Sequence, residues 1–94
     1  MDFGQAIETL KKGGKVARSG WNGKGMFLYL VYGQHVPMCN LRNEAGKHLK
    51  AKHNDHSEID INPHIDMKAA DGSIVVGWLA SQTDMLACDW EVVE

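Results

Sequence analysis

The sequence predicts an α+β fold, in which one N-terminal helix packs on a mostly antiparallel sheet of about four or five strands. Three observations predict it: an amphipathic pattern over residues 3–10, an apolar run over residues 26–32, and the turn dipeptide Asp71-Gly72 between two strand-like segments. A chain of 94 residues is too short to fill two cores, so we expect a single domain over residues 1–94.

The helix has a recognisable start, stripe and end. Asp2 and Gln5 have the offset of a capping box, and Gly13-Gly14 supplies residues that take the left-handed cap conformation cheaply. Apolar residues fall at i, i+3, i+4 and i+7, and they are Phe3, Ala6, Ile7 and Leu10. One face of this helix is therefore expected to pack on the sheet.

The strands alternate with glycine-rich or polar segments. Residues 15–19 predict a short strand, residues 20–25 carry three glycines and predict a loop, and residues 26–32 are aromatic and aliphatic throughout. A run that is apolar on both faces is typical of a central strand, covered by a helix on one side and by a ligand or another subunit on the other. Residues 40–62 are polar and predict a long excursion or a hairpin of modest stability.

The last third of the chain predicts a hairpin, a short helix and a final strand. Residues 67–70 and 73–78 flank the Asp-Gly turn and should pair. Ser81 and Asp84 have the Ser-x-x-Asp offset of a helix start, which leaves room for a single helical turn before a strand over residues 89–93.

Charge and composition exclude several classes of function. Ten Lys and Arg residues against twelve Asp and Glu residues give a net charge of −2 with no basic stripe, so long nucleic acid is not an expected partner. No apolar run approaches the length of a membrane span and no signal sequence is evident, so we expect a cytosolic protein without a membrane partner. Cys39 and Cys88 lack metal or disulfide spacing and are expected to be reduced, mostly buried thiols.

Two segments carry residues suited to binding a nucleotide. Residues 18–26 combine an indole, an amide, two cations and glycine amides, which can stack on a base, read polar edges and approach a phosphate. The alternative is that Trp21 plugs the core of a glycine-rich hairpin. Residues 78–86 place the free N–H groups of a helix start beside Trp78, and the alternative is self-capping with Trp78 in the core.

Metal binding and catalysis have weaker support in the sequence. The chain holds five histidines, His35, His48, His53, His56 and His64. His53 and His56 lie three residues apart, but their segment lacks helical periodicity, so a solvated polar loop is favoured over a metal site. No nucleophile lies at a recognisable spacing from a base, and no cofactor is expected. A thiol enzyme stays an open alternative, because His and Cys can meet in space from any positions.

Together, the two aromatic segments and their surroundings resemble a known family. The resemblance rests on residues 3–6, on Lys15-Val16-Ala17-Arg18-x-Gly20-Trp21-Asn22-Gly23-Lys24-Gly25-Met26, on residues 67–72, and on Trp78-x-Ala80-Ser81-Gln82-Thr83-Asp84-Met85-Leu86-Ala87-x-Asp89-Trp90-Glu91-Val92. These motifs are similar to those of the second-type Thoeris anti-defence family of small phage and prophage proteins. The polar middle, residues 42–62, departs from that pattern.

The resemblance implies a phage protein that sequesters a cyclic ADP-ribose isomer made by bacterial TIR enzymes, without cleaving it, in the cytoplasm of the infected host. Some family members are also thought to hold cyclic oligonucleotides of CBASS-type systems. The resemblance further implies a homotetramer with pockets between subunits. Trp90 is expected in the core. The expected ligand-binding residues are four pocket-wall side chains (Trp21, Phe27, Trp78 and Met85), five readers of ribose and base edges (Asn22, Asn40, Gln82, Thr83 and Asp84), and Arg18, which with glycine amides would neutralise phosphate.

Two functions from other classes remain alternatives. One is a nucleotide-signal hydrolase that uses His and Asp residues of the polar middle, with or without a metal. The other is a structural or partner-binding phage protein whose aromatic residues only fill the core.

Overall fold

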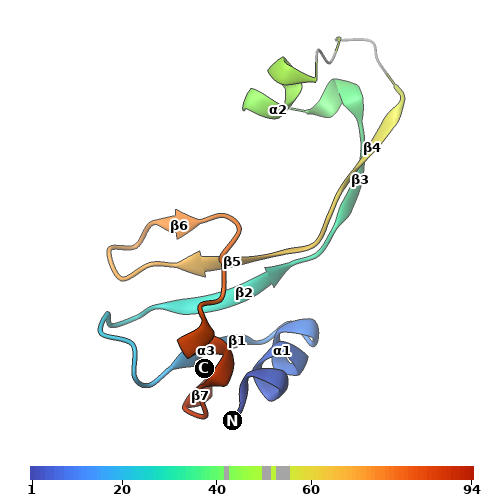
Figure 1. Ribbon diagram of the computed structural model, residues 1–94. Helices are drawn as coiled ribbons and strands as arrows, with labels where there is room; N and C mark the ends of the chain where they lie inside the picture. Colours follow the sequence, from blue (N-terminus) through green and yellow to red (C-terminus); the bar gives the residue numbers. More distant parts are fainter. Residues whose placement is uncertain (42, 50–51, 53–55) are drawn as a thin grey trace. The chain divides into compact units, whose positions relative to one another are not determined.

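The computed structural model describes residues 1–41, 43–49, 52 and 56–94 (Figure 1). The chain forms two compact units, one made of Met1–Val31 together with His64–Glu94 and the other of Tyr32–Pro63. The first unit holds a five-stranded sheet, and the second holds a separate two-stranded sheet. The assignment of the whole chain to one ligand-binding domain stays a prediction.

Helix α1 (Phe3–Lys11) begins and ends where the sequence predicts. The Asp2 carboxylate accepts the Gln5 backbone N–H at 2.8 Å, and the Gln5 side chain accepts the Asp2 N–H at 2.9 Å, which completes the capping box. Gly13 has a φ of 90°, a left-handed conformation that glycine adopts without steric cost. The predicted apolar stripe faces the core, where Leu10 is fully buried.

The main sheet is antiparallel between every pair of neighbouring strands. In spatial order its strands are β6 (Ile74–Val75), β5 (His64–Lys68), β2 (Phe27–Val31), β1 (Lys15–Arg18) and β7 (Trp90–Val93). The apolar strand β2 is central, as predicted, and its Leu28 lies opposite Val16 of β1 and Met67 of β5. Helix α1 packs on β1, β2 and β7.

A tight hairpin and a short helix connect β5 to β7. The Ala69 N–H donates to the Ser73 carbonyl at 2.8 Å across the predicted Asp-Gly turn, in which Gly72 has a φ of 92°. Helix α3 (Gln82–Leu86) begins with a complete capping box formed by Ser81 and Asp84. The α+β fold predicted from the sequence, including the short helix before the last strand, is confirmed.

The core lies between α1 and one face of the main sheet. Its buried apolar residues are Ala6, Leu10, Val16, Leu28 and Trp90. The expectation that Trp90 is a core residue is confirmed, since its side chain is 2% exposed. On the other face of β2, Phe27 and Tyr29 are only half-buried. The expectation that a ligand or another subunit covers that face stays a prediction.

The second unit is built on a hairpin of β3 (Gln34–Pro37) and β4 (Glu58–Ile61). Between these strands lie a 3₁₀ helix η1 (Met38–Asn40) and helix α2 (Asn43–His48). Residues 40–62, for which the sequence left a long excursion or a hairpin open, contain the long connection with α2 and only the second strand, β4. The first strand of the hairpin, β3, lies before this segment and was not predicted. The exposed imidazole of His35 contacts Glu58 through Nε2 and Asp60 through Nδ1. Both contacts raise the His35 pKa above its ordinary value of 6.5, with the hydrogen bond to Asp60 as the largest cause.

Among the described residues, no group of three or more His, Cys, Asp or Glu side chains is arranged to hold a metal ion. His53, which the sequence paired with His56, lies outside those residues. Among residues 1–41, 43–49, 52 and 56–94, no helix is long and apolar enough to cross a membrane. Cys39 is half-buried and Cys88 is exposed. The prediction of a buried thiol is therefore wrong for Cys88, because this residue lies in the loop between α3 and β7 rather than on the inner face of a strand.

Candidate functional site

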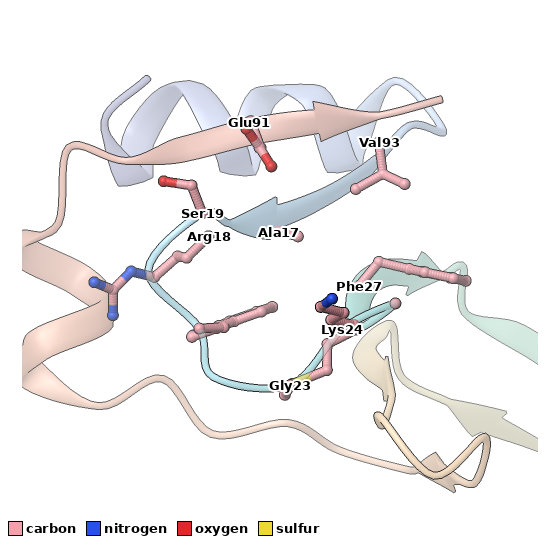
Figure 2. A pocket seen from close by; sticks show the side chains of 11 residues that line it. Ala17, Arg18, Ser19, Gly23, Lys24, Phe27, Glu91 and Val93 are labelled. Carbon is pink, nitrogen blue, oxygen red and sulfur yellow. The ribbon is translucent and has the colours of Figure 1, made fainter.

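A pocket of ≈ 300 Å³ opens in the first unit between the edge formed by β1 and β7 and the loop that joins β1 to β2 (Figure 2). Its lining residues are Ala17, Arg18, Ser19, Trp21, Gly23, Lys24, Gly25, Met26, Phe27, Glu91 and Val93. In Figure 2, Lys24 and Phe27 lie across the pocket from Glu91 and Val93 of β7. Most of the lining comes from the glycine-rich segment that the sequence singled out.

Two positions of this loop require glycine, each for a different structural reason. Gly25 has a φ of 76°, and its carbonyl accepts a hydrogen bond of 3.2 Å from the Lys68 ammonium, which holds the end of the loop against β5. At Gly23, an added Cβ would lie 2.6 Å from the Met26 sulfur and 2.7 Å from the Ala70 Cβ. A side chain at Gly23 would therefore push the loop away from the sheet.

Trp21 forms an aromatic wall of the pocket and also packs against the core. Its ring meets Trp90 edge to face, with centroids 5.4 Å apart and planes at 79°. The Trp21 indole N–H donates to the Asp84 carboxylate at 3.2 Å. The two interpretations of Trp21, core residue and pocket wall, are compatible, because the ring packs on Trp90 while the side chain is only half-buried.

Arg18 is paired with two carboxylates. Its Nη1 lies 2.8 Å from an oxygen of Asp84, and its Nε lies 2.8 Å from an oxygen of Asp89. Figure 2 shows the guanidinium directed away from Lys24 and Phe27. The predicted phosphate contact of Arg18 would compete with these two ion pairs.

The ion pairs also set the charge state of both acids. Burial by itself raises the Asp84 pKa, but hydrogen bonds from Arg18, Trp21 and Ser81 outweigh it and hold that pKa below its ordinary value of 3.8. The hydrogen bond from Arg18 is the largest cause that lowers the Asp89 pKa. Both acids are therefore ionised at neutral pH.

Cations other than Arg18 gather around the Phe27 ring. The Lys15 ammonium lies 4.8 Å from the ring centroid and the Lys68 ammonium lies 5.6 Å from it. Of the three lysines, Lys24 lines the pocket itself, whereas Lys15 and Lys68 approach it through the Phe27 ring. The sequence did not predict this group of cations. The feature that could have indicated it is strand pairing, since Phe27 of β2 lies directly opposite Lys68 of β5.

The remaining predicted site residues lie elsewhere in the structure. Trp78 packs edge to face on Trp90 at 6.2 Å and does not line the pocket of Figure 2. Asn22 is exposed in the β1–β2 loop, and Asn40 belongs to the second unit. Gln82, Thr83 and Met85 are exposed on α3. The structure therefore brings Arg18, Trp21 and Phe27 together at the pocket and places Asp84 directly behind Trp21.

The described lining holds few ionisable or hydroxyl side chains. Its ionisable side chains are one carboxylate, Glu91, and the cations Arg18 and Lys24, and its side-chain hydroxyl is that of Ser19. A nucleophilic Ser needs an adjacent general base, and no histidine is among the described lining residues. The aromatic rings and ammonium groups instead offer surfaces for stacking and for anions.

The fold and the site define a small α+β protein. Its N-terminal helix packs on an antiparallel sheet, and its surface pocket is lined by two aromatic rings, Arg18, Lys24 and Glu91. The chain belongs to the Tad2-like family, the Thoeris anti-defense 2-like domain, whose model matches residues 1–93. It is 42% identical over 93 residues to Thoeris anti-defense 2 of Bacillus phage SP01, a match that covers 99% of this chain and 94% of that protein.

The family assignment confirms the resemblance seen in the sequence and extends it through the polar middle, which the motifs had left out. The chain is accordingly a phage-type Thoeris anti-defence protein.

Proposed function

We propose that this protein inhibits Thoeris by binding a cyclic ADP-ribose-type signal and holding it uncleaved, in the cytoplasm of the infected host. The observation that carries the proposal is the pocket lined by Trp21, Phe27 and Lys24, together with the ammonium groups of Lys15 and Lys68 over the Phe27 ring. A signal of this class combines an adenine ring with a negatively charged diphosphate. An aromatic wall and a cationic rim match those two parts.

In the proposed complex the adenine stacks on Trp21 or Phe27. A contact between aromatic rings adds about 0.5–1.5 kcal/mol beyond the area that it buries. The diphosphate faces Lys24 and the lysines beside Phe27, rather than Arg18, because the Arg18 guanidinium is already paired with Asp84 and Asp89. This assignment replaces the phosphate role that the sequence suggested for Arg18.

The size of the pocket supports a homo-oligomer, and we propose a tetramer. Ligand pockets that bury most of a drug-sized molecule measure about 300–1,000 Å³, so ≈ 300 Å³ lies at the lower end. A ligand larger than the pocket would need a second wall, which another copy of the chain would supply. Strongly exposed aliphatic side chains, among them Val76, Leu79 and Leu86, are consistent with buried subunit contacts.

Sequestration requires high affinity, since the protein must outcompete the immune effector for its signal. A Kd near 1 nM corresponds to about −12 kcal/mol. Aromatic anchors in a desolvated pocket are the residues that most often supply such energies.

The proposal is tested by calorimetric titration of the purified protein with the TIR-made cyclic ADP-ribose signal. We expect saturable binding by the wild type and its loss in Trp21→Ala, with Lys12→Ala, an exposed change on the far end of α1, as the control. A folded Trp21→Ala variant that binds as tightly as the wild type would remove the pocket from the mechanism. Signal that disappears in excess over protein would identify a hydrolase.

A further inference from the structure

We infer that Asp84 is a positioning residue for Trp21, whose indole it fixes at the wall of the pocket by accepting the ring N–H. The inference rests on the proposed function for the identity of the ligand, but the orientation of Trp21 can be measured without any ligand. It gives Asp84 a role other than the direct reading of ribose or base edges expected from the sequence.

The side chain of Asp84 is held on several sides. One carboxylate oxygen accepts from the Trp21 indole at 3.2 Å and from Nη1 of Arg18 at 2.8 Å. The other oxygen lies 3.5 Å from the Ser81 backbone N–H, in the capping box of α3. The carboxylate is 14% exposed, so these protein donors take the place of water. An acceptor held in this way has one position, and so does the ring that donates to it.

The backbone of Asp84 anchors the second indole of the cluster. The Asp84 carbonyl accepts the Trp90 indole N–H at 2.9 Å. Trp90 in turn meets the Trp21 ring edge to face. One residue of α3 therefore orients both rings, and Trp21 is fixed by its N–H on one side and by the buried Trp90 on the other.

Besides its packing against Trp90 and the core, the Trp21 ring makes one hydrogen bond among the described contacts, the one to Asp84. Its neighbours in the loop, Asn22 and Lys24, are exposed, and the Trp21 backbone N–H is bound locally to the Arg18 carbonyl at 3.2 Å. Without the Asp84 contact the indole keeps its edge against Trp90 but can rotate toward solvent. A stacking surface that rotates must be ordered when the ligand binds, and that ordering reduces affinity.

The charge of Asp84 is a separate contribution from its position. Arg18 bridges Asp84 and Asp89, which places one cation between two anions. Asp84→Asn leaves an oxygen to accept the indole N–H and leaves Arg18 paired with Asp89. Asp84→Ala removes the acceptor altogether. The two variants therefore separate the hydrogen bond from the ion pair.

The test combines an NMR measurement of the Trp21 indole N–H with titration of the TIR-made cyclic ADP-ribose signal. Asp84→Ala is expected to shift and broaden the Trp21 indole resonance and to weaken binding about tenfold, whereas Asp84→Asn stays within about threefold of wild type. Ser81→Ala, which removes the cap of α3 without touching Trp21, is the matched control for helix stability. It should lower the melting temperature while leaving the indole resonance in place.

A double-mutant cycle separates positioning from general damage to the fold. In a Trp21→Phe background there is no indole N–H, so Asp84→Ala should change affinity by less than about twofold. An equal loss in both backgrounds would overturn the inference, as would an unchanged Trp21 resonance in Asp84→Ala. If the wild type fails to bind the signal, the proposed function fails, while the resonance still decides whether Asp84 holds Trp21.

Discussion

Replacing Lys24 by alanine should weaken binding of the signal without weakening the fold. Lys24 is exposed on the pocket loop, and its ammonium is one of the cations proposed to face the diphosphate. Two unit charges 4 Å apart interact by about 1 kcal/mol in water and about 4 kcal/mol at an effective dielectric constant of 20. Because the rim of the pocket is open to solvent, the lower half of that range applies. A loss of about 1–2 kcal/mol raises Kd by roughly five- to thirtyfold.

Calorimetric titration at low and at physiological ionic strength measures this effect. Screening weakens exposed charge pairs, so the gap between Lys24→Ala and wild type should narrow as salt is added. Lys12→Ala is the matched control, since it removes the same charge from the exposed end of α1. The reasoning is refuted if Lys24→Ala binds within about twofold of wild type, or if Lys12→Ala loses as much affinity as Lys24→Ala.

Three further predictions concern the fold, the second unit and assembly. Leu28→Ala should cost about 2–5 kcal/mol, because Leu28 is fully buried in the central strand, whereas Leu49→Ala at a half-exposed site should stay within about 0.5 kcal/mol in chemical denaturation. The His35 contacts should stabilise the β3–β4 hairpin below pH 6.5 and lose that effect as pH rises through the raised His35 pKa; an NMR titration should find this pKa above 6.5 and lowered by Asp60→Asn. Light scattering should give the mass of a tetramer, and a monomer at micromolar concentration would contradict the proposed assembly.

The features that the sequence predicted well are local ones. Both capping boxes and the Asp-Gly hairpin depend on residues two to four positions apart, so their chemistry is visible in a short window. The apolar run of β2 also predicted its central place, because a strand apolar on both faces is seldom an edge strand.

The arrangement of the site depends on contacts that no short window contains. Arg18 pairs with Asp89, which is 71 positions away in the chain. Because of this ion pair, a residue that the sequence suggested for binding phosphate instead links β1 to the loop before β7. The cations beside Phe27 were missed because Lys68 reaches the ring only through the register of β5 on β2. Trp21 and Trp78 have similar chemistry in the sequence, yet only Trp21 lines the pocket of Figure 2.

The most direct test of sequestration is whether bound signal returns intact when the protein is destroyed. The TIR-made signal is incubated with a stoichiometric amount of protein, the mixture is ultrafiltered, and the filtrate is assayed for activation of the Thoeris effector before and after heat denaturation of the protein. The account predicts an inactive filtrate that regains full activity after denaturation, with the signal unchanged in mass. A filtrate that stays inactive because the signal has been cleaved, or one that is active from the start, would contradict it.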